Sequence, residues 1–183
     1  AVSSRSRQQH CFATNNGNIM YLNNLDFPFV SFLENAFSDI KRECLNLPTT
    51  TFDPWVQRDM YEEGWSVYGL IAWGYEIDEA LSACPITSQL LKKIPGVQTA
   101  GFSRLAPGTH IKPHRGWVTN VYRLHLGLVV PQGCAMRVGE ETRSWQEGKC
   151  LVFDDTSEHE AWNKYNQDRF ILLLDFLRPG CEP

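Results

Sequence analysis

The spacing of apolar positions indicates helices in the first third of the chain. In "FPFVSFLENAFSDIKREC" the apolar residues recur at spacings of three and four, at Phe29, Phe32, Leu33, Phe37 and Ile40. This spacing predicts one amphipathic helix, with Pro28 near its start, that packs on the outside of a sheet. A second, shorter helix is expected at "ITSQLLKKI", with Thr87 or Ser88 as its cap and Pro95 and Gly96 after its end.

From Gly64 onward the pattern changes to short β-rich runs separated by Gly, Pro, Asn and Asp turns. The runs are "SVYGLIAW", "TAGFSRL", "VYRLHLGLVV", "CAMRV", "KCLVF" and "RFILLLDF". Short strands at this spacing predict a mainly β sandwich or barrel. Because no repeat or linker is visible, we predict one domain over residues 1–183, with helical and loop support in 1–60 and a β core in 61–177.

Alternation of side chains along a strand predicts which polar residues share a face. Arg123, His125 and Gly127 lie on one face of their strand, and Arg169 shares a face with apolar residues of the last strand. In "GFSRL", Ser103 points with the apolar Leu that follows. A buried arginine is seldom tolerated without an anion. Arg169, which opens the last long strand, can therefore hold a dicarboxylate through bidentate hydrogen bonds.

Composition and charge narrow the classes of function. The formal charge is −4 without a basic stripe, which argues against a nucleic-acid partner. The six cysteines form no C-x-x-C pair, so a structural zinc site is not indicated. No apolar run reaches the roughly 18 to 20 residues of a spanning helix, and "AVSSRSRQQHCF" lacks the apolar segment of a secretory signal. We expect a cytoplasmic protein without a membrane span; the sequence does not indicate an oligomeric state.

Two histidines stand where distant strands of a small barrel can meet at one metal. His114 lies in "HIKPHRG", and His159 lies in "FDDTSEHEAW". A non-haem iron site generally needs two histidines and one carboxylate, and the carboxylate often lies two residues after the first histidine. Gly116 takes that place here. The residues alone leave open whether "PHRG" is a turn, a broken metal site or a metal site with one ligand fewer.

The stretches "GFSRLAPGTHIKPHRG", "RLHLGLVVP", "LVFDDTSEHEAW" and "RFILLLDF" resemble the aspartyl/asparaginyl β-hydroxylase family of Fe(II)- and 2-oxoglutarate-dependent oxygenases. The likeness covers roughly Glu62 to Asp175. It implies a double-stranded β-helix, a cupin-like jelly roll, with a few flanking N-terminal helices. It also implies a metal held by two histidines without a carboxylate, with O2 and 2-oxoglutarate as cosubstrates.

The resemblance implies roles for individual residues. Matched by motif, the iron ligands and catalytic residues are His114 and His159. The residues that match the 2-oxoglutarate site are Ser103, Arg123, His125 and Arg169. Arg169 matches the family arginine that holds the distal carboxylate of 2-oxoglutarate, and Ser103 matches a serine that assists it. Arg123 and His125 match the pair around the oxalyl end of 2-oxoglutarate.

Other residues near these motifs have competing interpretations. In an extended chain His110 lies on the same face as His114, so a site in which three histidines bind the metal, as in cupins, is the alternative. Family members carry a histidine at this position without using it as a metal ligand. The resemblance therefore predicts that His110 forms a hydrogen bond within the turn. Asp154 and Asp155 are expected to form the turn before His159 and to bind backbone or neighbouring groups. The tryptophans expected in the core or in a pocket wall are Trp65, Trp73 and Trp162.

The resemblance implies hydroxylation of an unactivated carbon. Family members hydroxylate the β-carbon of aspartyl or asparaginyl residues, and relatives hydroxylate lipid acyl chains. A substrate-contacting arginine of the family is missing from "NVYR", just before Arg123. We expect the β-carbon of such a residue, or a related amino-acid, peptide or carrier-bound substrate. The alternatives are a halogenase, which uses the missing carboxylate to admit chloride, a lipid acyl-chain hydroxylase and a non-catalytic cupin-like binding module.

Overall fold

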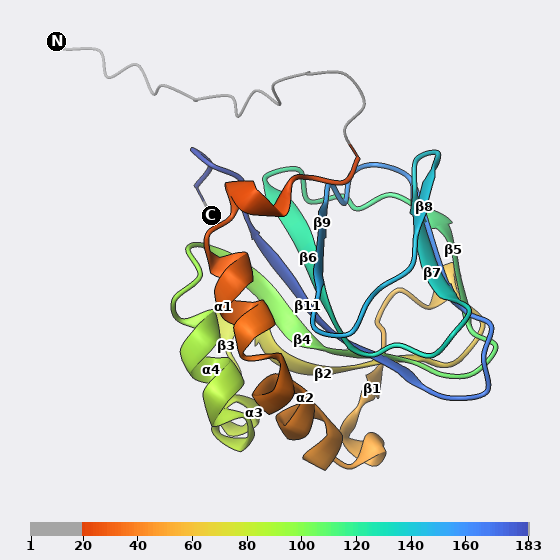
Figure 1. The fold of residues 1–183 in the computed structure, drawn as a ribbon, viewed down its shortest axis with the longest axis horizontal. Helices are drawn as coiled ribbons and strands as arrows, with labels where there is room; N and C mark the ends of the chain where they lie inside the picture. Colours follow the sequence, from red (N-terminus) through yellow and green to blue (C-terminus); the bar gives the residue numbers. More distant parts are fainter. Residues whose placement is uncertain (1–19, 183) are drawn as a thin grey trace, which may run out of the picture.

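The computed structural model describes residues 20–182, in which two antiparallel sheets face each other and helices cover the outer face of the larger sheet (Figure 1). The helices are α1 (Phe29–Asn35), α2 (Phe37–Asn46), α3 (Asp78–Ala83) and α4 (Pro85–Leu91), with 3-10 turns η1 (Asn24–Asp26), η2 (Thr49–Thr51) and η3 (Arg58–Met60). The strands are β1 (Asp53–Pro54), β2 (Trp65–Ala72), β3 (Tyr75–Glu76), β4 (Val97–Leu105), β5 (His110–His114), β6 (Val121–Val129), β7 (Cys134–Val138), β8 (Glu141–Arg143), β9 (Cys150–Phe153), β10 (His159–Asn163) and β11 (Arg169–Leu177).

The strand order is that of a double-stranded β-helix. The larger sheet has the order β1-β2-β4-β11-β6-β9, with β3 also paired to β2, and the smaller sheet has the order β5-β10-β7-β8. From β4 onward the chain passes back and forth between the two sheets, with the β7–β8 hairpin kept within the smaller one. This alternation confirms the jelly-roll prediction, and it leaves an interior between the sheets.

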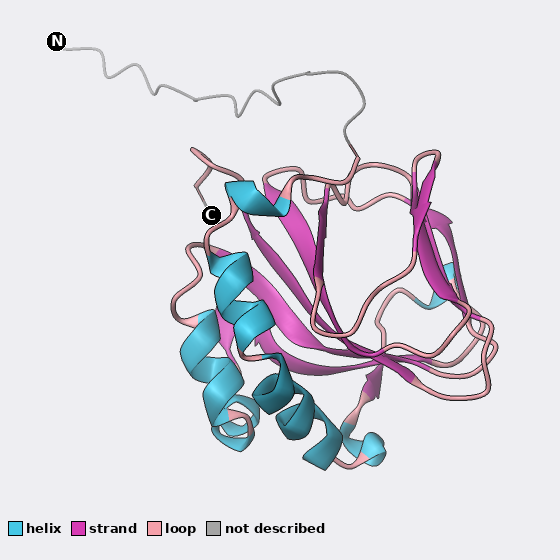
Figure 2. Cartoon of the chain, viewed as in Figure 1, coloured by secondary structure: helices cyan, strands magenta, loops and turns pink. Residues whose placement is uncertain are grey.

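Two apolar cores lie on opposite faces of the larger sheet. Leu172 belongs to the core that packs against the helices, together with Leu33 of α1 and Ile40 of α2. Ile171 belongs to the second core, which includes Phe153 and lies between the sheets. Figure 2 shows the helices gathered on one side of the strands. Adjacent residues of β11 thus belong to different cores, as the alternation of side chains along a strand predicted.

The N-terminal amphipathic segment forms two helices where one was predicted. Helix α1 ends at Asn35 and α2 begins at Phe37, because Ala36 between them has the non-helical angles φ −90° and ψ 7°. Leu33 and Ile40 are both fully buried against the sheet. The change of direction at Ala36 therefore keeps the apolar face that the spacing indicated.

The predicted second helix begins earlier than expected. Helix α4 starts with Pro85 after the cap position Cys84, so Thr87 and Ser88 lie inside the helix and are buried. The carboxylate of Glu43 in α2 accepts hydrogen bonds from the Thr87 backbone N–H at 2.9 Å and from its hydroxyl at 2.6 Å. A side chain distant in sequence thus satisfies the helix N-terminus, which local patterns do not reveal. Helix α3 was not predicted.

The six predicted β-rich runs correspond to β2, β4, β6, β7, β9 and β11. The pattern did not identify β5 and β10 as strands, although they carry His114 and His159. In β5 only Ile111 is buried and Pro113 interrupts the run, so an alternating signal is weak there. None of the helices in residues 20–182 has the length and apolarity needed to cross a bilayer.

Candidate functional site

His114 and His159 face each other on neighbouring strands of the smaller sheet. They are paired in register between β5 and β10, and their ring centroids are 4.1 Å apart. The Nδ1 atom of His114 lies 2.7 Å from the carbonyl oxygen of Lys112, and Nδ1 of His159 lies 2.8 Å from that of Ser157. Because a carbonyl only accepts, each Nδ1 carries the hydrogen and each Nε2 offers a lone pair, as metal-ligating imidazoles do.

Burial keeps both imidazoles in their neutral form. It lowers the pKa of His114 below the ordinary 6.5. Burial, together with the nearby His114, lowers the pKa of His159 to about 3. Neutral imidazole is the form that binds a metal ion, so the pair is ready to ligate at neutral pH.

Asp155 occupies the space beside Gly116, where a conventional carboxylate ligand would begin. A Cβ atom on Gly116 would overlap the Oδ2 atom of Asp155. The Oδ1 atom of Asp155 lies 3.3 Å from Nε2 of His159 and 2.6 Å from Nη1 of Arg123. Asp154 does form the predicted turn, since its Oδ1 accepts a hydrogen bond from the Thr156 backbone at 3.0 Å. Asp155 instead lies in the site. The sequence feature that could have indicated this is its position four residues before His159.

Arg123 is held between two carboxylates. Its Nε and Nη2 donate to Asp175 at 2.7 and 2.9 Å, and Nη1 lies 2.6 Å from Asp155. Burial opposes the charge of this guanidinium, but the two carboxylates outweigh it and raise the pKa of Arg123. Arg123 therefore already has the anionic partners that its burial requires, and it orients Asp155 toward the histidines.

A small cavity beside the histidine pair contains buried donors without partners. Its lining includes Ser103, Arg123, His125, Arg169, Trp145, His114 and His159. Arg169 is only 2% exposed, and within residues 20–182 its Nε and Nη1 atoms have no hydrogen-bond partner, nor does Nε2 of His125. Burial lowers the pKa of Arg169 to about 10, so it is charged at neutral pH. Each unpaired buried donor costs about 1–3 kcal/mol, so the cavity suits an anion.

Trp145 sets the tautomer of His125. Its Nε1 donates to Nδ1 of His125 at 3.3 Å, which leaves the imidazole hydrogen on Nε2, the atom without a partner. Burial and the charges of Arg123 and Arg169 hold the pKa of His125 well below 6.5. The ring of Trp145 also packs against the Arg169 guanidinium, 4.8 Å from its centroid. The sequence analysis missed Trp145, because it lies outside the predicted strands.

Ser103 also points into the cavity. The Nε1 atom of Trp65 donates to Oγ of Ser103 at 3.1 Å. The Ser103 hydroxyl hydrogen therefore remains available to donate to a bound anion. The fold thus brings Ser103, His125 and Arg169, each of which alternation assigned to a face of its own strand, to one cavity.

His110 lies outside the site. Its side chain is 51% exposed, and its Nε2 atom lies 2.7 Å from Oε2 of Glu160. In the pairing of β5 with β10, β5 has one extra residue between Ile111 and His114. His110 and His114 therefore lie on opposite faces, whereas a regular extended strand would place them on the same face. The expected turn hydrogen bond is replaced by the Glu160 contact. Among residues 20–182, no group of three or more His, Cys, Asp or Glu side chains is arranged to hold a metal ion.

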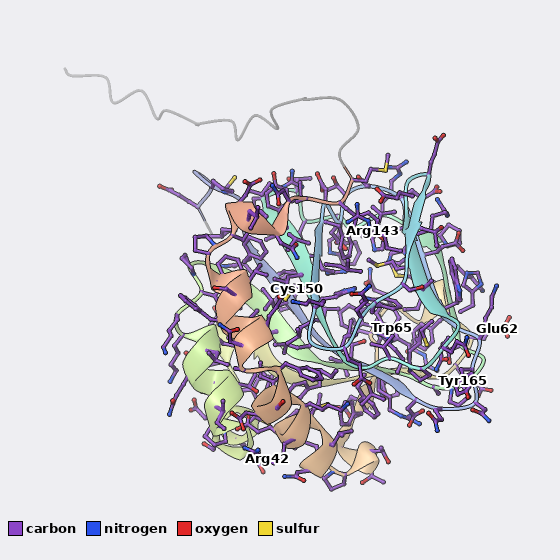
Figure 3. The ribbon with its side chains drawn as sticks, viewed as in Figure 1. Arg42, Glu62, Trp65, Arg143, Cys150 and Tyr165 are labelled. Carbon is purple, nitrogen blue, oxygen red and sulfur yellow. The ribbon has the colours of Figure 1, made fainter. Side chains whose placement is uncertain are left out.

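An apolar groove of about 250 Å³ has His114 in its lining and runs along β2 and β4. Its apolar walls include Trp55, Met60, Trp65, Trp73, Trp117 and Leu173. Gly69 and Gly101 also line it, and they pair directly across the two strands, so part of its floor has no side chains. Trp65, which Figure 3 shows among the side chains between the sheets, lines both groove and cavity. The groove and the cavity are therefore neighbours that share part of their walls.

The fold and the paired histidines define a cupin-type jelly-roll protein. A prolyl hydroxylase of Trichoplax adhaerens, solved with a hypoxia inducible factor peptide, superposes with a TM-score of 0.52 over 78% of each chain, at 14% identity. At that identity the likeness supports the fold alone. The family described as aspartyl/asparaginyl beta-hydroxylase matches residues 34–179. The chain belongs to this family, which confirms the resemblance drawn from its motifs.

Curated relatives include hydroxylases of two kinds. An ornithine lipid ester-linked acyl 2-hydroxylase of Rhizobium tropici is 37% identical over 178 residues, which cover 91% of this chain and 63% of that protein. The human aspartyl/asparaginyl beta-hydroxylase is 39% identical over 134 residues, which cover 68% of this chain and 17% of that protein. The chain thus spans less than two thirds of either relative.

Proposed function

We propose that the chain is an Fe(II)- and 2-oxoglutarate-dependent dioxygenase that hydroxylates an unactivated carbon of a lipid acyl chain. The unpaired buried donors of Arg169 and His125 carry this proposal. Leaving such groups without partners is costly, and a small dicarboxylate in the cavity would satisfy them. A purely structural core would not retain them without an anion.

The residues fit iron and 2-oxoglutarate. His114 and His159 would hold the iron through their Nε2 atoms. Arg169 and Ser103 would bind the distal carboxylate of 2-oxoglutarate, and the Nε2 hydrogen of His125 would bind its oxalyl end. When bound, the iron supplies the activation of O2, and 2-oxoglutarate is converted to succinate and carbon dioxide as one oxygen atom enters the substrate.

Arg123 contributes mainly by positioning Asp155. Its donors to Asp175 and its contact with Asp155 are already made, so a direct contact with the cosubstrate would add to these. The two arginines and two aspartates of the site balance in charge. Iron(II) with a doubly charged 2-oxoglutarate adds no net charge, so loading the site leaves the interior neutral.

Asp155 favours hydroxylation over halogenation. A halogenase uses the space of the missing carboxylate for chloride, but here the Asp155 carboxylate fills the volume beside Gly116. A negative charge at that place also repels chloride. We therefore propose that substrate carbon receives oxygen, which mass spectrometry of the product in chloride buffer can check directly.

The groove supports an acyl chain as the substrate. Its walls are largely aromatic and aliphatic, and the Gly69–Gly101 pair adds no side chains to its floor. The rhizobial relative, named for action on an ester-linked acyl chain, aligns with 91% of this chain. The β-carbon of an aspartyl or asparaginyl residue is the second candidate, favoured by the 39% identity to the human enzyme.

Succinate formation from 2-oxoglutarate tests the cofactor assignment. The purified protein with Fe(II), 2-oxoglutarate, O2 and an ester-linked acyl lipid should form succinate, carbon dioxide and a product heavier by one oxygen atom. His114→Ala and His159→Ala should abolish both products, whereas His110→Ala should retain most activity because that side chain faces solvent. Retained turnover in either of the first two variants would refute the ligand assignment, and absence of turnover in the wild type with any substrate would favour a binding module.

A further inference from the structure

Exposed apolar side chains surround the opening of the groove. We call this set the rim, which consists of Val56, Trp73, Tyr75, Ile77 and Trp117. Their exposed fractions are 83%, 67%, 79%, 39% and 70%, respectively. They are five of the nine large apolar side chains that are exposed in residues 20–182. Single exposed apolar residues are ordinary on a protein surface, but a group around one opening indicates an interaction site.

Each member of the rim lies at the groove. Val56, Trp73 and Trp117 are part of its lining. Tyr75 pairs with Ala72, another lining residue, and Cδ1 of Ile77 lies against the position of Gly69 in the floor. Three separate segments contribute these residues: the loop after β1, the β2–β3 hairpin with the residue that follows it, and the loop after β5. The fold therefore brings apolar residues from distant parts of the sequence to the entrance of one space.

Trp73 occupies a backbone position that does not favour tryptophan. It has φ 54° and is followed by Gly74 with φ 78°, in a two-residue turn closed by the pairing of Ala72 with Tyr75. Such turns prefer Asn, Asp or Gly, because left-handed backbone is unfavourable for a bulky side chain. Trp73 is 67% exposed, so packing inside the protein does not explain its presence. An unfavourable backbone conformation kept at an exposed position indicates a functional contact, and for Trp73 that contact would be at the groove entrance.

The charges near the rim indicate the kind of partner. In residues 55–60, 72–79 and 115–118, Arg58 and Arg115 are outnumbered by Asp59, Glu76, Asp78 and Glu79. A face without a basic patch offers no attraction to anionic lipids or to an acidic carrier protein, so the lipid surface that it suits is a zwitterionic one. Tryptophan and tyrosine are the residues enriched at the interface between lipid and water, because their rings are apolar and their N–H or O–H groups remain hydrated.

We propose that the rim is a membrane-docking surface that rests on the interfacial layer of a zwitterionic phospholipid bilayer. Docking there would place the groove entrance against the lipid, so an acyl chain would reach the histidines without crossing water. The purpose of docking rests on the proposed acyl substrate. Docking itself requires neither iron nor 2-oxoglutarate, and so it can be measured apart from turnover.

Co-sedimentation with phosphatidylcholine vesicles tests the proposal on the protein without iron or 2-oxoglutarate. The wild type should sediment with the vesicles. Trp73→Asn combined with Trp117→Gln should lower the partition coefficient by roughly tenfold or more, since two interfacial rings are lost. Tyr75→Ser, which changes the rim but no residue of the groove lining, should lower it by about two- to fivefold. Asn suits the turn at position 73, so thermal unfolding should show a protein at least as stable with Trp73→Asn alone.

The matched control changes exposed apolar residues that belong neither to the groove lining nor to the rim. Leu25 in η1 and Leu45 in α2 are 88% and 50% exposed, and the combination of Leu25→Ser with Leu45→Ser should bind vesicles like the wild type. The proposal is overturned if the wild type stays in the supernatant, if the rim variants bind as well as the wild type, or if the control loses binding equally. It is also overturned if the rim instead joins two copies, which gel filtration without vesicles would show as a rim-dependent dimer.

Vesicle binding and turnover can fail independently. If the wild type binds vesicles through the rim but forms no succinate, the docking surface stands and the proposed function fails. If it forms succinate but does not bind vesicles, the proposed cofactor assignment stands and the docking surface fails.

Discussion

At the scale of single residues, the site is defined by groups whose partners are absent from the protein itself. Arg169 and His125 are buried with donors that no described residue satisfies, whereas Arg123 is bound to two aspartates. Sequence patterns placed all three on an inner face but could not distinguish a satisfied arginine from an unsatisfied one. That difference depends on Asp155 and Asp175, which reach Arg123 only in the folded chain.

Arg169→Met is expected to raise the stability of the cofactor-free protein by about 1–3 kcal/mol, because it removes a buried charge without a partner. We expect 2-oxoglutarate to raise the melting temperature of the wild type, and the same variant should lose this increase. Thermal unfolding with and without 2-oxoglutarate measures both effects. A less stable variant, or one still stabilised by 2-oxoglutarate, would contradict the assignment.

Arg104→Met is the matched control on a neighbouring strand. Arg104 forms two hydrogen bonds with Asp168, at 2.8 and 3.0 Å. Its removal should therefore not raise stability, and the response to 2-oxoglutarate should remain.

At the scale of elements, the two strands that carry the histidine pair were not identified from the sequence pattern. The long strands of the larger sheet have many buried residues and were predicted well, whereas β5 and β10 are five residues each. The extra residue in β5 reverses the face of His110, and no local pattern reveals a bulge whose partner lies on another strand. The family resemblance, and not periodicity, identified His114 and His159 as a pair.

Gly116→Ala tests the contact between the loop after β5 and the segment before β10. The added Cβ would overlap the Asp155 carboxylate, so we expect a loss of about 1–3 kcal/mol in the free energy of unfolding and reduced turnover. Asp155→Ala in the same chain should relieve much of the stability loss, which a double-mutant cycle would report as coupling. Strictly additive effects would show that the two residues do not compete for this space.

At the scale of the whole molecule, the fold holds three histidines in neutral form, of which His125 and His159 are buried and His114 is half-buried. Burial lowers the pKa values of His114, His125 and His159, the last to about 3. Once unfolded, each would titrate near 6.5, so the unfolded state binds more protons below that pH. Their contribution to stability is complete above 6.5 and is lost as the pH falls toward the folded pKa values.

The free energy of unfolding should therefore fall between pH 6.5 and 5, with a slope of up to about 1.4 kcal/mol per pH unit for each of His125 and His159 and a smaller slope for the half-buried His114. This range lies above the titration of ordinary carboxylates. Chemical denaturation across it measures the slope, and His159→Gln should make it shallower. A stability that is flat or rises over this range in the wild type would contradict the burial of neutral imidazoles.

The measurement that tests the account most directly is anaerobic visible absorption after Fe(II) and 2-oxoglutarate are added to the protein. If the histidine pair and the cavity hold both, a charge-transfer band from iron chelated by 2-oxoglutarate should appear in the wild type and in His110→Ala. The band should be absent in His114→Ala and His159→Ala and strongly weakened in Arg169→Met. A wild type without the band, or a band that survives loss of either histidine, would contradict the account.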